Sequence, residues 1–115
     1  EKAHDHYIRR KDQYISIGRP ANWYNNIAWY LARTGTMLEK AIEYSKKSLD
    51  LEPDTAIYLD TLAECYFMNG DTKKAIELIK KAIARYESES ALIYFKQQLE
   101  RFEKKQKTTE NKEKD

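Results

Sequence analysis

Glycine, proline and cysteine are scarce in this chain of 115 residues, and it has no long apolar stretch. Its three glycines and two prolines favour long regular elements over a loop-rich fold. The glycines lie far apart, which excludes a glycine-rich phosphate-binding loop. The single cysteine, Cys65, excludes an intrachain disulfide and a multi-cysteine zinc site. The longest apolar run, residues 27–32, is far shorter than the roughly 20 residues of a transmembrane helix, so we expect a soluble domain without membrane insertion.

The charges are nearly balanced, with 21 Lys and Arg residues against 19 Asp and Glu residues and a net charge of +2. Because the two signs are interspersed, they form no basic face of the kind that nucleic-acid backbones require. His4 and His6 are two residues apart and would point to different faces of a helix, which does not suit a metal or catalytic pair. We therefore expect no enzyme activity, no cofactor and no metal. The chain begins at Glu1, and we expect a fragment of a larger protein whose localisation stays open.

A repeat of about 35 residues organises the middle of the chain. Four positions keep their internal spacing and recur 35 residues later: Tyr24, Ile27, Ala28 and Leu31 correspond to Leu59, Leu62, Ala63 and Tyr66. Ala41 recurs 34 residues later as Ala75, so the first repeat has one extra residue after Gly35. Insertions of this kind belong in turns.

The apolar spacing within each repeat is helical, following i, i+3, i+4 and i+7. Gly35 and Gly70 each follow the first stripe of a repeat, where a helix can end in a left-handed residue at least cost. The pattern therefore predicts four helices, near residues 21–34, 37–51, 55–69 and 72–86.

Polar residues at the expected helix starts suggest how these helices are capped. Thr36 and Glu39 have the spacing of a capping box that would open the second helix. Asp71 can cap the fourth helix. Pro53 followed by Asp54 is expected to end the first pair and cap the second.

The order of these positions resembles the tetratricopeptide repeat, whose pattern is W-x2-L-G-x2-Y, then A-x3-F, then P. The matching positions are Tyr24, Ile27, Ala28, Leu31, Ala41 and Pro53 in the first repeat, and Leu59, Leu62, Ala63, Tyr66, Ala75 and Ala82 in the second. The resemblance implies an all-α, right-handed solenoid of antiparallel helix pairs. It also implies a non-catalytic scaffold for protein–protein interaction.

The flanks of the repeats follow different patterns. Residues 89–106 carry an apolar stripe of Leu92, Phe95, Leu99 and Phe102, while Lys96, Gln97, Glu100 and Arg101 cover the rest. This pattern predicts a capping helix, or alternatively the first helix of a truncated third repeat. We expect an N-terminal flanking helix and linker over residues 1–20, repeats over 21–54 and 55–87, a capping helix over 88–106 and a disordered charged tail over 107–115.

One stripe on each first helix is not needed for pairing within a repeat: Asn25, Trp29 and Arg33, and 35 residues later Asp60, Glu64 and Met68. In proteins similar to tetratricopeptide repeats, first helices line a concave groove that receives a peptide or a partner helix. Trp29 is the expected anchor, unless the N-terminal helix covers it. Asp60 and Glu64 would favour a ligand with basic residues.

Two other functions compete with peptide binding. The chain could form a homodimer through an uncapped end of the solenoid. A pentatricopeptide-like array that binds RNA has the same period, but its pairs tend to carry a bulky residue where Ser48 and Ala82 stand. The near-neutral charge also disfavours RNA.

Overall fold

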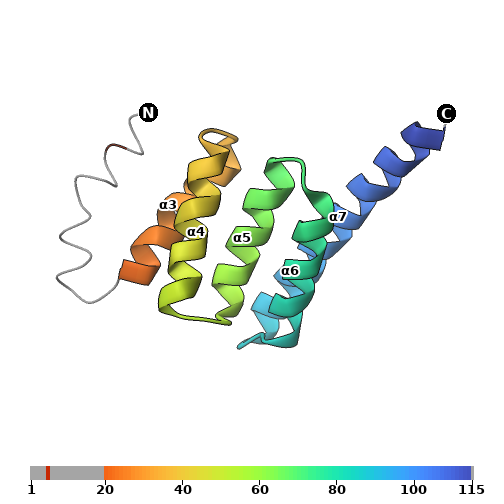
Figure 1. Ribbon diagram of the computed structural model, residues 1–115. Helices are drawn as coiled ribbons and strands as arrows, with labels where there is room; N and C mark the ends of the chain where they lie inside the picture. The colour runs from red at the N-terminus through yellow and green to blue at the C-terminus, as the bar shows by residue number, and fades with distance from the viewer. Residues whose placement is uncertain (1–4, 6–19, 115) are drawn as a thin grey trace.

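The computed structural model describes residue 5 and residues 20–114, which from Pro20 onward form a row of antiparallel helices (Figure 1). The helices are α3 (Pro20–Thr34), α4 (Leu38–Leu51), α5 (Ala56–Met68), α6 (Thr72–Ala84) and α7 (Glu89–Lys114). The four helices expected in the repeats are confirmed, each end within two residues of its predicted position. The predicted N-terminal flanking helix lies outside the described residues.

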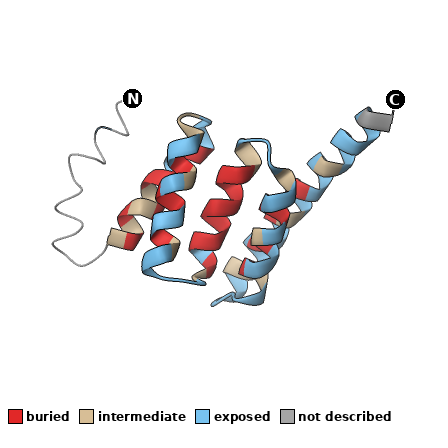
Figure 2. Ribbon diagram, in the orientation of Figure 1, coloured by how far each residue is buried: buried red, intermediate tan, exposed pale blue. Residues whose placement is uncertain are grey.

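Helix α5 is the centre of the fold, since it packs against α3, α4 and α6. Most of its residues are buried, as Figure 2 shows. One apolar cluster joins α3 and α4 to α5, and a second joins α5 and α6 to α7. Ala28 and Ala63 are completely buried, as are Ala41 and Ala75 on the second helices. Small side chains at these positions let the helices approach closely, as the repeat pattern predicts.

Both first helices end in the same hydrogen-bonded turn. Gly35 and Gly70 have φ values of +70° and +92°, which glycine adopts without strain. The N–H groups that follow α3 bond back to the carbonyls of Leu31 and Ala32, and those that follow α5 bond to Tyr66 and Phe67. This is the Schellman arrangement, and it turns the chain directly into the second helix of each pair.

The start of α4 differs from the predicted capping box. Thr36 pairs its hydroxyl with that of Thr34 and does not cap the helix with Glu39. The cap position is Met37, in a left-handed conformation with φ 49° and no side-chain hydrogen bond. Met37 therefore accommodates the extra residue of the first turn. The predicted cap at Asp71 is confirmed, because its carboxylate accepts the backbone N–H of Lys74 at 3.2 Å.

The cap predicted between the two repeats is also wrong. The residue before α5 is Thr55, whose hydroxyl donates back to the carbonyl of Glu52 at 2.9 Å. Asp54 takes a left-handed conformation with φ 61°, and its carboxylate pairs with Arg85 at 3.6 Å. Asp54 therefore pairs with Arg85 at the end of α6 and does not cap α5.

Helix α7 packs along α6 and buries Phe95 and Phe102, in agreement with the apolar stripe seen in the sequence. It continues to Lys114, where a disordered tail was expected from residue 107 onward. Lysine, glutamate and glutamine are good helix formers, and no glycine or proline follows Gly70 to stop the helix. The last turns extend past the other helices (Figure 1).

Candidate functional site

A cavity of about 930 Å³ lies on the face formed by α3, α5 and α7. Four of the six predicted groove residues line it: Asn25, Trp29, Arg33 and Asp60. Glu64 and Met68 are not among its lining residues. The volume falls in the range of about 300–1,000 Å³ that small-ligand sites occupy. The cavity therefore has room for side chains of a ligand.

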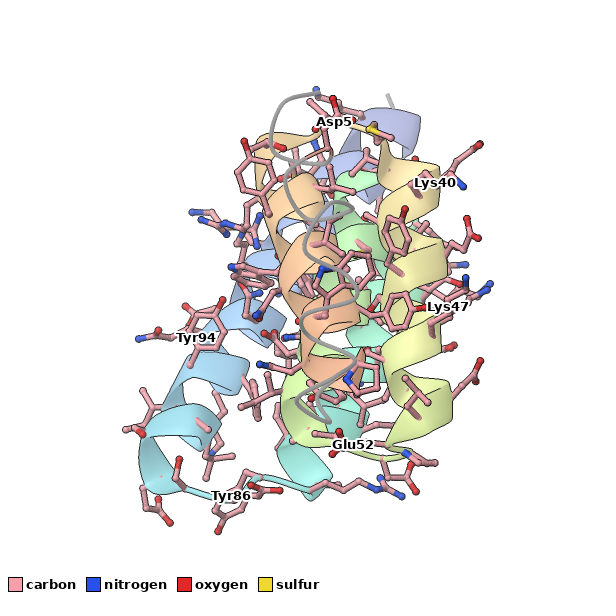
Figure 3. All side chains as sticks on the ribbon, turned by 90° about the vertical axis from the view of Figure 1, so that its left-hand side faces the viewer. Asp5, Lys40, Lys47, Glu52, Tyr86 and Tyr94 are labelled. Atoms are coloured by element: carbon pink, nitrogen blue, oxygen red, sulfur yellow. The ribbon has the colours of Figure 1, made fainter. Side chains whose placement is uncertain are left out.

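Aromatic side chains form much of the cavity wall. Trp29 is half-buried on α3, beside Tyr30, and Tyr94 comes from α7 on the other side. Figure 3 shows Tyr94 on the side of the molecule opposite to Lys40 and Lys47 of α4. The alternative that an N-terminal helix covers Trp29 concerns a segment outside the described residues.

Glu64 is the centre of a polar network next to the cavity, and its side chain is 1% exposed. The guanidinium of Arg101 donates to both carboxylate oxygens, at 2.7 Å and 3.1 Å. Gln98 donates to the same carboxylate at 3.1 Å, and Arg33 lies 3.5 Å from it. Residues from α3, α5 and α7 thus meet at one buried carboxylate.

Arg101 was expected among the solvent-facing residues of its helix; its side chain is 39% exposed, but it also binds a buried carboxylate, which was not expected. Its guanidinium lies over Phe67 at 4.6 Å from the ring centre and over Phe102 at 5.6 Å, while it binds Glu64. The hydrogen bond to Glu64 raises the pKa of Arg101 most, and burial of the guanidinium opposes that rise. Gln98 and Arg101 share one face of α7 by their i, i+3 spacing, which was the one signal in the sequence that they act together.

Asp60 borders both the network and the cavity, and its residue is 4% exposed. Gln98 donates to its Oδ1 at 3.4 Å, a long hydrogen bond. Burial raises the pKa of Asp60 from 3.8 to about 7, against the opposing effect of the bond from Gln98. The charge of Glu64 adds to the rise, whereas Arg101 and Arg33 oppose it. Asp60 therefore changes its charge near neutral pH.

Asn25 lies at the position of the first repeat that corresponds to Asp60 in the second. It is 7% exposed, and its Oδ1 is buried without a hydrogen-bond donor among the described residues. A buried acceptor without a donor costs about 1–3 kcal/mol. Asn25 is among the residues that line the cavity, although its Oδ1 has almost no surface open to solvent.

The remaining sequence-predicted residues lie away from the cavity. Met68 is half-buried at the end of α5 near Gly35. Cys65 is completely buried, as expected for a small apolar residue, and burial raises the pKa of its thiol to about 12. No three His, Cys, Asp or Glu side chains within the described part of the chain are close enough to share a metal ion.

One of the comparisons with known proteins agrees with this architecture. Among the described helices, none has the length and apolar character needed to cross a membrane. Neither the curated proteins nor the solved structures contain a significant match to this chain. The sequence profile of the tetratricopeptide repeat matches residues 20–88, which is more than half of the chain. The chain therefore belongs to the tetratricopeptide repeat family.

Proposed function

We propose that this chain is a non-catalytic scaffold that binds a peptide or a partner segment in the groove along α3 and α5. Tetratricopeptide repeats are generally scaffolds for protein interaction. In this chain α7 supplies a third wall, so the groove is bounded by helices from both repeats and from the C-terminal flank.

The observation that carries this proposal is the cavity itself. Its wall includes Trp29, which is half-buried, and Tyr94, which is 37% exposed. Ile57, on the same wall, is 55% exposed. Large aromatic and aliphatic side chains left open to water in a concave site are the usual anchors of a protein interface.

The charges of the groove favour a ligand with basic residues. Asp60 is the acidic group on the wall, and the cation of Arg33 lies over the Trp29 ring at 5.4 Å from its centre. Glu64 would affect the ligand indirectly, because its carboxylate lies 3.5 Å from the guanidinium of Arg33 on the cavity wall. Met68 would contact the ligand at the end of the groove near Gly35.

The test is selection of peptides from a displayed random library, followed by titration of the selected sequences against variants. Trp29→Ala should weaken binding by more than about 1 kcal/mol, about fivefold in Kd, with little change in melting temperature. Tyr86→Ala is the matched control, because this exposed aromatic residue lies outside the cavity. If Trp29→Ala lowers the melting temperature and leaves binding intact, Trp29 belongs to the core and the groove loses its anchor.

The two alternatives make different predictions for the same sample. A homodimer would raise the mass measured by light scattering toward twice 13.7 kDa as concentration increases. An RNA-binding array would show affinity that falls steeply with salt. Ser48 and Ala82 are completely buried between helices, which favours the tetratricopeptide arrangement over the RNA-binding one.

A further inference from the structure

Asp60 on the cavity wall and Glu64 in the adjacent network differ in the number of donors that each carboxylate receives. Glu64 receives hydrogen bonds from Arg101 and Gln98 and lies 3.5 Å from Arg33. Asp60 receives one long hydrogen bond, from the neutral amide of Gln98, and no other donor among the described residues reaches it. Asp60 is thus a carboxylate on the cavity wall with free capacity for donors.

A second acceptor without a donor belongs to a residue that lines the same cavity. Asn25 is more than nine-tenths buried, and its Oδ1 has no donor within the described part of the chain. Asn25 on α3 and Asp60 on α5 occupy corresponding positions of the two repeats, and these helices pack side by side. Adjacent helices therefore hold two acceptors, one of them charged, and the Asn25 side chain must turn toward the cavity before a ligand can reach its Oδ1.

The rest of the wall suits a flat cation. Trp29 and Tyr94 present aromatic rings from α3 and α7. The Trp29 ring already attracts the guanidinium of Arg33, and guanidinium groups stack on such rings in general. Arg33 is the cation among the lining residues and lies 3.5 Å from Glu64, whereas no cation of the described residues is within ion-pair distance of the Asp60 carboxylate.

We propose that the groove receives an arginine side chain of its peptide ligand, whose guanidinium donates to the Asp60 carboxylate and the Asn25 amide oxygen beside Trp29 and Tyr94. The inference rests on the proposed function, namely that the groove binds a peptide. Arginine fits better than lysine for two reasons. Its five donors in one plane can reach acceptors on two helices, and its weak hydration makes burial less costly.

Binding of this cation is coupled to release of a proton. Burial raises the pKa of Asp60 to about 7, so in the free protein about half of the carboxyl groups are protonated at neutral pH. The charged groups that face it are Arg33 on α3, Glu64 on α5 and Arg101 on α7, and the Tyr94 phenol stays neutral because burial raises its pKa to about 12. A guanidinium binds the ionised form. Between about pH 6 and about pH 8, the ionised fraction and the affinity should therefore rise about tenfold.

The experiment compares three blocked pentapeptides: one with a central arginine between alanines, one with citrulline and one with lysine at that position. Citrulline keeps the shape of arginine and lacks its charge. Binding is followed by NMR of the indole N–H groups at about pH 6 and about pH 8. Trp29 is the reporter, and Trp23, which is 1% exposed and lies outside the cavity lining, is the internal reference.

We expect the arginine peptide to shift the Trp29 signal with about tenfold higher affinity at the higher pH, and the citrulline peptide to bind at least about tenfold more weakly there. Asp60→Asn should remove both differences. Asp50→Asn, which removes an exposed carboxylate on α4, should keep them. Signals of the folded protein in each variant show that lost binding does not come from unfolding.

Three results would overturn the inference. Equal binding of the citrulline and arginine peptides would exclude a cation site while leaving peptide binding in the groove, and so the proposed function, intact. Tighter binding of the lysine peptide would overturn the assignment to a guanidinium. No shift of Trp29 with any of the three would also overturn it, and the displayed library would then decide separately whether the groove binds peptides at all.

Discussion

Replacing Asp60 with asparagine should stabilise the protein at neutral and alkaline pH and have little effect in acid. The side chain of asparagine has nearly the shape of a protonated aspartic acid and does not titrate. In the folded protein burial raises the pKa of Asp60 to about 7, whereas the unfolded chain keeps the ordinary value of 3.8. Between these two values the folded state holds a proton that the unfolded state has lost.

The sign and size of the effect follow from this difference. A raised pKa stabilises the fold most below pH 3.8, and that stabilisation is lost as pH rises toward 7. The pKa difference is about three units, and each is equivalent to about 1.4 kcal/mol, so Asp60 costs the folded wild type at most about 4 kcal/mol above pH 7. Asp60→Asn removes this cost and lets Gln98 keep its hydrogen bond.

The assay is urea unfolding of the wild type and Asp60→Asn, followed by circular dichroism across a pH series. The difference in free energy of unfolding should be small near pH 4, grow through pH 5 and 6, and become constant above about pH 8. Asp50→Asn is the control for loss of one negative charge at an exposed site. A difference that does not change with pH, or a wild type more stable than Asp60→Asn at pH 8, would refute the reasoning.

Three further changes test the packing that surrounds the groove. Arg101→Met leaves the buried Glu64 carboxylate with Arg33 as its remaining cation, and should lower the free energy of unfolding by about 2–4 kcal/mol in urea titrations. Adding Glu64→Gln to that variant should recover part of the loss, and simple additivity of the two changes would contradict the role of the network. Ala63→Leu should cost about 1–3 kcal/mol by overpacking a site that is completely buried, and a melting temperature equal to that of the wild type would show unexpected space there. Deletion of residues 88–115 should expose the face of α6 that α7 covers and cause aggregation or loss of cooperative melting, whereas a truncated protein that melts as sharply and as high as the parent would show that α7 is dispensable.

The repeat pattern predicted the fold well because the residue type at each repeat position is set by its immediate neighbours in the fold. A small residue such as Ala63 is required wherever two helices cross closely, and a glycine such as Gly70 is favoured wherever a helix ends in a left-handed turn. These requirements are local and recur in both repeats, so they can be recognised in one sequence. The cap at Met37 could not be recognised, since many conformations of the turn can accommodate the extra residue.

The site was harder to predict because its parts come from distant segments. Spacing placed Asp60 and Glu64 on one face of a helix, but it did not show that α7 would cover Glu64. The partner of Glu64 is Arg101, 37 residues later, in a segment that lies outside the repeat pattern. Other charged residues, such as Glu100 and Glu103, lie close to it in the sequence, and only its contact with Glu64 on α5 distinguishes it from them.

The buried position of Cys65 gives this chain a chemical reporter of its own motions. Its sulfur lies 3.9 Å from the carbonyl oxygen of Ala28, in the interface between α3 and α5. Thiol reagents attack the thiolate, and with a pKa of about 12 the closed protein contains almost none of it at neutral pH. Labelling therefore requires α3 and α5 to separate, and its rate measures how often they do so. Because this is the sole cysteine in the sequence, the rate measures the opening of one interface, the one that holds the two walls of the groove together.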